Sequence, residues 1–354
     1  MARQFVTGLI LILAIMTTVL LISTSLEISR IYQSKSLELA SYLKLILFKL
    51  PFLIEEIIPF IFLLASIFTL VRLTKSNELV VAKAAGISVW QFLLPLILIA
   101  ILFGIFIVTI FNPFSTTLLE KFDRLTNKYS NKSYNSIVID DNGIWLTDKT
   151  LDNNIIIHSK SFNQNQSLLK TAIFYLFDKN GKFLQRLDAT EAKLENNTWT
   201  LYNINILNDR EITYKTANIM NIPTSIKISK LQDNFASPKK ISFWNLFAFI
   251  RTLKMTGFSG VKYHIHLYKL VILPIYLASM VILAAVFSLR SYFFQRKNFS
   301  IVIGISSGFI IYFMFDIIAA FGLSGKLYPS ISVFVPVFIL LLISVAALIH
   351  LENG

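Results

Sequence analysis

The stretch AAGISVWQFLLPLILIAILFGIFIVTIF, residues Ala84 to Phe111, decides the fold because it contains no charged side chain. A helix needs about 20 predominantly apolar residues to cross the hydrocarbon core of a bilayer. The run exceeds that length, and it predicts a membrane-spanning helix rather than the core of a soluble domain.

Five more apolar runs along the chain have a comparable character. They are Phe5–Leu26, Ile57–Val71, Leu270–Leu289, Phe299–Phe315 and Leu327–Leu351. Ile57–Val71 reaches full length only if Pro51–Glu56 is included. Phe5–Leu26 is longer than the apolar part of a signal peptide, which favours a retained helix. The chain has 354 residues, of which 55% are hydrophobic and 15% charged, whereas soluble domains have about 25% charged residues. We therefore predict a membrane α-helical fold with six spans.

Between the third and fourth spans, from Asn112 to Lys269, the composition changes and the pattern becomes that of β-strands. The segments NSIVID, GIWLTD, NIIIHSK, TAIFYLFD, KFLQRLDAT, TWTLYNINIL and EITYKTANI are rich in β-branched and aromatic residues. The turn sequences DDNG, DKNG, ENN and LNDR separate them. Several short strands at regular spacing predict an inserted all-β sandwich or jelly-roll-like domain.

The predicted organisation is 3+3. It comprises spans one to three in residues 1–111, a jelly-roll-like domain in 112–238, a basic connecting segment in 239–269 and spans four to six in 270–354. The connecting segment has six basic residues and no acidic one: Lys239, Lys240, Arg251, Lys254, Lys262 and Lys269. Basic residues at an interface attract anionic lipid head groups, and this position argues against nucleic acid as a partner.

Orientation follows from the lysines and arginines in the short loops, because the richer side is cytoplasmic. One side would carry Arg3, Arg72, Lys75, Lys83, Arg290, Arg296 and Lys297, and the other Arg30, Lys35, Lys44, Lys49 and Lys326. This bias predicts cytoplasmic termini and a periplasmic β domain.

Several kinds of chemistry are excluded or disfavoured by residues that the sequence lacks. There is no cysteine and there are only four histidines, so a thiolate site is impossible and a zinc site has few ligands. The phosphate-binding motif GxxxxGK[ST] is missing, so any ATP must be hydrolysed by another polypeptide. We expect no cofactor and no metal.

The segment RLTKSNELVVAKAAGIS, Arg72 to Ser88, interrupts two apolar runs with helix-forming residues. A Ser or Asn at its start and Gly86 at its end are typical helix boundaries, which predicts a short cytoplasmic helix. One interpretation is a coupling helix that docks onto a motor protein through Glu78, Leu79, Lys83 and Gly86. The alternative is that Glu78 only stabilises the helix start through the helix dipole.

The chain resembles the LptF/LptG family of lipopolysaccharide export permeases over essentially its whole length. The resemblance is carried by SNELVVAKAAGIS after span two, the Pro51–Pro59 entry to that span, GIWLTD, IFYLFDKNGKFLQRLDATEAKLENNTWTL, and GFIIYFMFDIIAAFG in span five. The sequence ELVV…AAG is more similar to the LptG branch of the family than to the LptF branch.

The resemblance implies one half of an ABC-type permease in a bacterial inner membrane. It implies pairing with an LptF-like permease, an LptB-like ATPase dimer and an LptC-like bitopic protein, with lipopolysaccharide as the substrate. Basic residues near the periplasmic helix ends would contact the substrate: Arg30, Lys35, Lys49, Lys121 and Arg124. Each could equally be an interface anchor. Some relatives have a lysine directly after the first proline, where this chain has Phe52.

Of three further features, two have two interpretations each. Asp316 lies late in span five and is either a functional intramembrane carboxylate or an interface residue. Glu55 and Glu56 are expected at the interface. The run Phe174–Phe177 is either plain domain core or part of a groove for acyl chains.

Rival functions fit the sequence less well. A membrane enzyme lacks a nucleophile or carboxylate pair at convincing spacing, and a secondary transporter would have more spans and polar residues at the midplane. An ABC permease with a large domain after its first helix differs from this chain, whose domain follows the third. A permease or scaffold subunit for another lipid or lipoprotein substrate remains the alternative.

Overall fold

The computed structural model describes residues 2–32, 38–76, 78, 86, 88–129, 137–140, 143–149, 153–163, 166–179, 181–195, 197–208, 215–225, 237–293 and 297–353. It divides into two compact units. The helical unit contains residues 1–128, 242–244 and 264–354, and the β unit contains residues 129–241 and 245–263.

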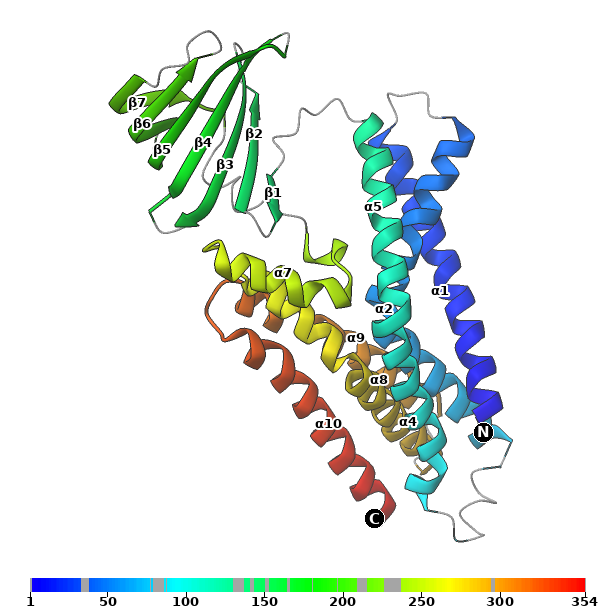
Figure 1. The fold of residues 1–354 in the computed structure, drawn as a ribbon. Helices are drawn as coiled ribbons and strands as arrows, with labels where there is room; N and C mark the ends of the chain where they lie inside the picture. The colour runs from blue at the N-terminus through cyan, green and yellow to red at the C-terminus, as the bar shows by residue number, and fades with distance from the viewer. Residues whose placement is uncertain are drawn as a thin grey trace. The chain divides into compact units, whose positions relative to one another are not determined.

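The described residues include six helices that are long and apolar enough to cross a membrane, as predicted. In the labels of Figure 1 they are α1 (Ala2–Ile31), α2 (Leu39–Lys75), the continuous helix formed by α4 (Val89–Phe106), η1 (Ile107–Phe111) and α5 (Asn112–Tyr129), α8 (Val261–Phe293), α9 (Lys297–Leu323) and α10 (Pro329–Asn353).

The third span continues as a helix past residue 111, where its apolar run ends, to Tyr129. The reason is an apolar stripe at helical spacing on α5, on which Leu119 is buried and Phe122 is half-buried. The junction of α4 and α5 is a π-helical turn, in which the Asn112 N–H donates to the Ile107 carbonyl. Pro113 follows this turn directly.

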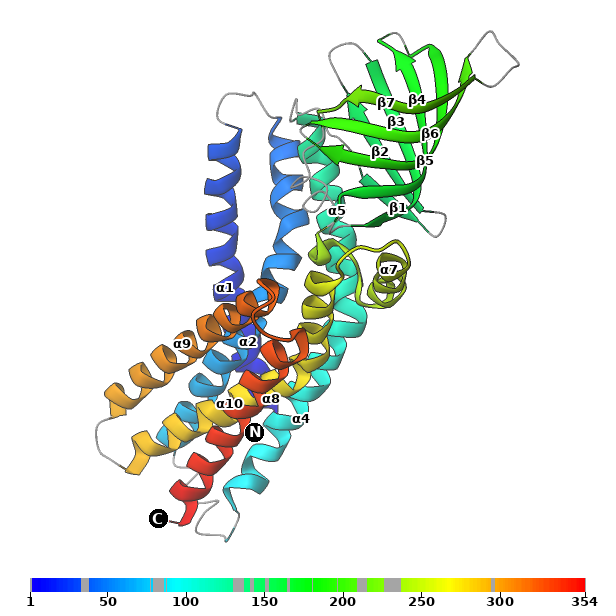
Figure 2. The same cartoon turned by 90° about the vertical axis from the view of Figure 1, so that its left-hand side faces the viewer.

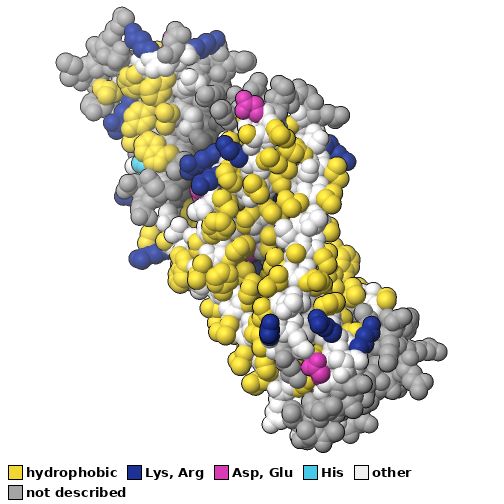
Figure 3. Space-filling model, turned by 90° about the vertical axis from the view of Figure 1, so that its right-hand side faces the viewer, with side chains coloured by type: hydrophobic (Ala, Val, Ile, Leu, Met, Phe, Trp, Pro, Cys, Tyr) yellow, Lys and Arg dark blue, Asp and Glu magenta, His cyan; other side chains and the backbone are white. Residues whose placement is uncertain are grey.

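Close packing inside the helical unit depends on small residues. A Cβ at Gly104 of α4 would lie 2.5 Å from the Pro274 Cα of α8, so only glycine allows this backbone approach. Apolar side chains cover the middle of this unit on the face seen in Figure 3, and basic side chains lie toward both of its ends. This is the distribution that a bilayer requires.

The β unit contains a seven-stranded antiparallel sheet in simple sequential order. Its strands are β1 (Ile137–Asp140), β2 (Gly143–Lys149), β3 (Asn153–Asn163), β4 (Leu168–Asp178), β5 (Phe183–Glu195), β6 (Thr198–Asn208) and β7 (Lys215–Pro223). The strands coincide with the seven predicted segments, and Figure 2 shows the sheet strongly curved. The inserted β domain is confirmed, whereas its jelly-roll topology stays a prediction.

A crease crosses five strands of the sheet, where the ladder of paired residues omits one position on each strand without a change of register. These positions are Lys160, Thr171, Thr190, Asn203 and Asn218. Thr171 and Asn203 have positive φ values of 52° and 51°. An unpaired position reverses the alternation of side chains. The same face is consequently buried on both sides of the crease.

The two rows that flank the crease are aligned across the sheet. Ser159, Ala172, Ala189 and Ile204 form one row, and Phe162, Leu169, Ala192 and Leu201 form the other. Three alanines at the bend leave room for the strands to approach, and larger side chains such as Phe174 and Trp199 fill the core farther away, with their ring centroids 6.0 Å apart.

A buried carboxylate holds the rolled sheet together. Asp148 on β2 is 0% exposed and accepts hydrogen bonds from the hydroxyls of Thr224 and Ser225 and, at 3.1 Å, from the Ser225 N–H. Since β2 lies near one edge of the sheet and Thr224 follows β7 at the other edge, this contact joins the two edges.

Much of the connecting segment is helical. The short 3-10 turn η2 (Pro238–Lys240) precedes α7 (Phe243–Met255), and α8 begins at Val261, ahead of the apolar run from Leu270. The α7 helix has apolar residues at helical spacing, with Leu246 and Leu253 buried. This spacing gives a short helix that the sequence analysis did not predict.

Candidate functional site

One end of the helical unit gathers four segments that are far apart in the sequence. Gln4 at the start of α1 donates to the Glu78 carboxylate, which follows α2, at 3.2 Å. The Val89 N–H at the start of α4 likewise has a distant acceptor, the Glu352 carboxylate near the end of α10, at 3.1 Å. Both chain termini therefore lie at the same end of the helical unit as Glu78 and Ser88 (Figure 1). An even number of spans requires this arrangement.

Two of the four residues predicted to contact an ATPase are described. Glu78 is exposed, and its carboxylate also accepts from the Ser76 hydroxyl at 3.0 Å. Gly86 is exposed with φ +78°, which suits a glycine just after a helix. Leu79, Lys83 and the predicted helix between them lie outside the described residues. The segment ends where Ser88 and Gln91 form a capping box that opens α4.

At the opposite end of the helical unit, Lys49 joins three helices. Its Nζ lies 2.7 Å from the Glu27 carboxylate on α1 and 5.6 Å from the centre of the Phe122 ring on α5. The Lys49 side chain is only 17% exposed. An ammonium held in this way positions α1, α2 and α5 relative to one another, and its charge is already partly neutralised.

The other basic candidates at this end are more accessible. Arg30 in the last turn of α1 and Lys121 and Arg124 on α5 are exposed. Arg124 lies 3.9 Å from Glu120 one turn earlier, and such an exposed pair contributes at most about 1 kcal/mol. Lys35 lies outside the described residues. Arg30, Lys121 and Arg124 are thus the described candidates best able to meet an anionic group.

Asp316 on α9 has a specific partner that the sequence analysis did not identify. The Lys269 Nζ on α8 lies 2.6 Å from its carboxylate and 5.2 Å from the centre of the Phe315 ring. Half of the Asp316 side chain is exposed. The pair joins the first part of α8 to the last part of α9.

The run Phe174–Phe177 alternates between the two faces of the sheet. Phe174 is 0% exposed, whereas Tyr175 faces the other side and lies 5.7 Å from the Arg186 guanidinium. Phe177 contacts Phe183 across the turn between β4 and β5, with ring centroids 5.8 Å apart. Phe174 therefore belongs to the filled core of the sheet.

Glu55 of α2 has partners that the sequence analysis did not identify. Its carboxylate is turned toward α5 and accepts hydrogen bonds from two buried polar side chains, Asn112 and Ser115. The sequence contains two features that belong to this contact. One is a carboxylate in the second span, and the other is the sequence Asn-Pro-x-Ser in the third. No sequence pattern reveals which helix faces which.

Among the residues that the structure describes, no three His, Asp or Glu side chains converge in a way that could hold a metal ion. The chemistry at both ends of the helical unit is that of hydrogen bonds and ion pairs between helices and of exposed charges. Such an arrangement suits docking and the movement of charged molecules.

Known proteins resemble this chain over nearly its whole length. The family model described as lipopolysaccharide export system permease LptF/LptG matches residues 1–350. The lipopolysaccharide export system permease protein LptG of Haemophilus influenzae is 25% identical over 308 residues, which cover 81% of this chain and 82% of that protein. LptG of Escherichia coli K12 is 23% identical over 340 residues, which cover 91% and 90%. The chain belongs to the LptF/LptG family of lipopolysaccharide export system permeases.

Proposed function

We propose that this chain is the LptG-type permease subunit of an ABC transporter in a bacterial inner membrane. It extracts lipopolysaccharide from the membrane and passes it through a periplasmic β unit toward a bridge to the outer membrane. An LptF-like permease, an LptB-like ATPase dimer and an LptC-like protein complete the machine.

The observation that carries the proposal is the separation of two groups of residues along the helical unit. Glu78 lies at the end that holds both chain termini. Arg30, Lys49, Lys121 and Arg124 lie near the opposite ends of α1, α2 and α5. This separation suits a permease in which an ATPase acts on one side of the membrane and an anionic lipid is held on the other.

The exposed arginines and lysine supply the chemistry for the substrate. Lipopolysaccharide carries phosphates, and guanidinium groups bind phosphate through paired hydrogen bonds. Arg30 and Arg124 are exposed for such contacts. The segment Arg72–Ser88 supplies the contact with the ATPase, because an ATPase from another chain would bind a surface at the end of α2.

The test is purification of the full-length chain in mild detergent, with identification of the chains that accompany it. The purified complex is then placed in vesicles that contain lipopolysaccharide, and ATP-dependent transfer to a soluble acceptor is measured. We expect an ATPase to co-purify and transfer to require ATP. Transfer of phospholipid or lipoprotein in place of lipopolysaccharide would favour the alternative substrate, and the lack of any ATPase would overturn the proposal.

A further inference from the structure

The helical unit contains a polar junction that the proposed function does not use. Glu55 of α2 accepts hydrogen bonds from the Asn112 amide at 2.7 Å and from the Ser115 hydroxyl at 2.8 Å. Asn112 and Ser115 are 2% and 0% exposed. A carboxylate among apolar helices is costly, so a junction of this kind calls for an explanation.

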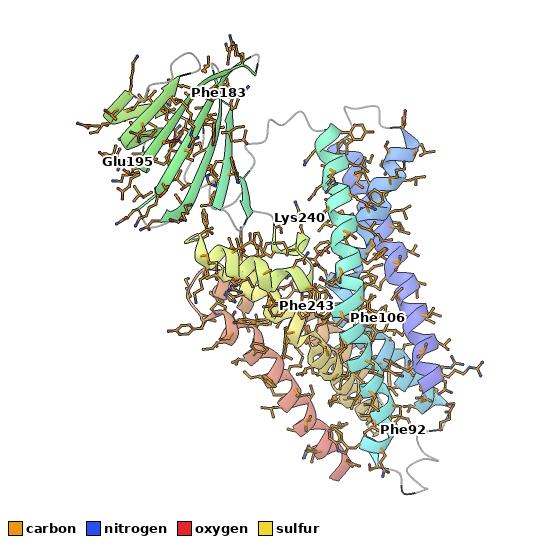
Figure 4. The ribbon with its side chains drawn as sticks, in the orientation of Figure 1. Phe92, Phe106, Phe183, Glu195, Lys240 and Phe243 are labelled. Carbon is orange, nitrogen blue, oxygen red and sulfur yellow. The ribbon has the colours of Figure 1, made fainter. Side chains whose placement is uncertain are left out.

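Asn112 connects this carboxylate to α7. Its amide donates to Glu55 through Nδ2, and its Oδ1 accepts from the Phe243 N–H at 2.8 Å. Phe243 is the first residue of α7, where the backbone N–H groups have no acceptor within the helix. Asn112 thereby caps α7 from another helix. Figure 4 labels Phe243 at the start of α7.

A second hydrogen bond holds the same turn of α7. Pro113 has no N–H to donate to the Thr109 carbonyl four residues earlier. The Trp244 indole Nε1–H donates to this carbonyl at 3.1 Å. The first two residues of α7 thus donate hydrogen bonds to two groups beside the π-helical turn. One is the Asn112 side chain, and the other is the Thr109 carbonyl, to which Pro113 cannot donate. We call Glu55, Thr109, Asn112 and Ser115 the α7 seat.

The seat lies beside features that favour bending in two helices. In α2, Glu55 lies between Pro51 and Pro59, and each proline removes a helical hydrogen bond. In the neighbouring helix, Asn112 lies between the π-helical turn and Pro113. The α2 helix ends at Lys75, directly before the segment that carries Glu78. Bending of α2 would therefore change the direction of the Glu55 side chain.

We propose that Glu55 is a positioning residue for transport, which acts through Asn112 to seat the first turn of α7 at the joint of α2 and α5. This rests on the proposed function, because the movement of α2 would come from the ATPase at its end. Phe243 and Trp244 belong to the helical unit, and the rest of α7 belongs to the β unit. The α7 seat therefore holds the two residues of α7 that belong to the helical unit.

The first measurement uses the isolated full-length chain and needs no partner. Hydrogen–deuterium exchange at the first turn of α7 reports whether this turn is seated. Glu55→Leu removes the acceptor for Asn112, and Asn112→Asp places two carboxylates against each other. We expect about tenfold faster exchange in both variants. Glu55→Gln keeps an acceptor and should exchange like the wild type.

The double variant Glu55→Gln with Asn112→Asp reverses the donor and acceptor of the pair. The amide introduced at position 55 can donate to the carboxylate introduced at position 112, and this carboxylate can still accept from the Phe243 N–H. We expect the double variant to recover the wild-type exchange rate. The matched control is Thr18→Val, which removes a 2.9 Å hydrogen bond within α1 and should leave α7 unchanged.

The second measurement uses the assembled transporter and counts ATP hydrolysed per lipopolysaccharide transferred. We expect Glu55→Leu to raise this ratio about tenfold and the double variant to restore it. Normal coupling in Glu55→Leu, despite faster exchange at α7, would overturn the positioning role. Unchanged exchange would overturn the seat itself. If the wild type transfers no lipopolysaccharide, the proposed function fails, and the exchange measurement still decides whether Glu55 seats α7.

Discussion

Asp148 shows how a single residue can determine the form of a sheet. Its buried carboxylate accepts hydrogen bonds from two residues that directly follow β7, although Asp148 itself lies on β2. A buried charge is tolerated only when hydrogen bonds replace its hydration. The contact therefore favours the rolled sheet over a flat one, whose edges would be far apart.

Replacing Asp148 by Ala should destabilise the β unit by about 3 kcal/mol, because a buried donor that loses its acceptor costs about 1–3 kcal/mol. Asp148→Asn keeps one acceptor oxygen and should cost about 1 kcal/mol. The measurement is the urea dependence of limited proteolysis within residues 137–225 of the full-length chain. Equal resistance of the two variants would show that the hydrogen bonds at Asp148 do not stabilise the rolled sheet.

Substitutions at a second residue, Glu78, test the hypothesis that the segment after α2 binds an ATPase. Its exposed carboxylate is held by Gln4 and Ser76 and remains accessible. Loss of a charge-assisted hydrogen bond costs about 1.5–3 kcal/mol, so Glu78→Ala should weaken binding of the ATPase about ten- to a hundredfold. The measurement is recovery of the ATPase with the wild type, Glu78→Ala and Glu78→Ser at matched expression. Equal recovery from all three would leave Glu78 as a helix-start residue only.

Among the secondary-structure elements, α7 ends in a defined glycine turn. The Phe258 N–H donates to the Leu253 carbonyl at 3.0 Å, and Gly257 has φ +81°. This is the Schellman arrangement for ending a helix. It also fixes α7 to β3, because the Phe162 N–H donates to the Thr256 carbonyl at 2.9 Å and the Phe162 and Phe258 rings stack with centroids 5.0 Å apart.

Gly257→Ala should destabilise the β unit by about 2–4 kcal/mol. The positive φ costs about 1–2 kcal/mol in any residue with a Cβ, and crowding adds about as much or more. The crowding arises because the new Cβ would lie 2.4 Å from the Phe162 carbonyl oxygen. Gly181→Ala is the matched control, because φ is +78° there and no heavy atom lies within 4 Å of the new Cβ. If both variants unfold at the same urea concentration, the contact of Gly257 with β3 does not contribute to the stability of the β unit.

At the scale of the whole molecule, the described residues include six helices that can span a membrane, an even number, and Figure 1 shows both termini at one end of the helical unit. A β insertion between the third and fourth spans must then lie on the side of the membrane opposite the termini. The basic loop residues favour cytoplasmic termini, which predicts a periplasmic β unit.

Single cysteines can test this topology, because the chain has no cysteine of its own. Lys182→Cys in the β unit and Ser76→Cys after α2 are both at exposed positions. An impermeant thiol reagent added to intact spheroplasts should label position 182 and leave position 76 unlabelled. Labelling of position 76 before permeabilisation would reverse the orientation.

The sequence by itself determined the features that depend on neighbouring residues. Apolar runs predicted all six spans, and β-branched segments between Asp, Asn and Gly turns predicted all seven strands. The family followed from the order of these features, and the matching model covers residues 1–350. Such patterns are readable because helix and strand periodicity and turn conformation are local properties.

Only the tertiary structure decided which side chains meet. Glu55 and Asn112 are 57 residues apart, and Asp148 and Ser225 are 77 apart. The alternation along each strand gave no sign of the crease, which exists because unpaired positions on five strands are aligned. In the first turn of α7, the Phe243 N–H donates to the Asn112 side chain and the Trp244 indole N–H donates to the Thr109 carbonyl. Hydrogen-bond partners of buried polar groups come from whichever segments pack together, so a single sequence names the donors and acceptors while the packing alone pairs them.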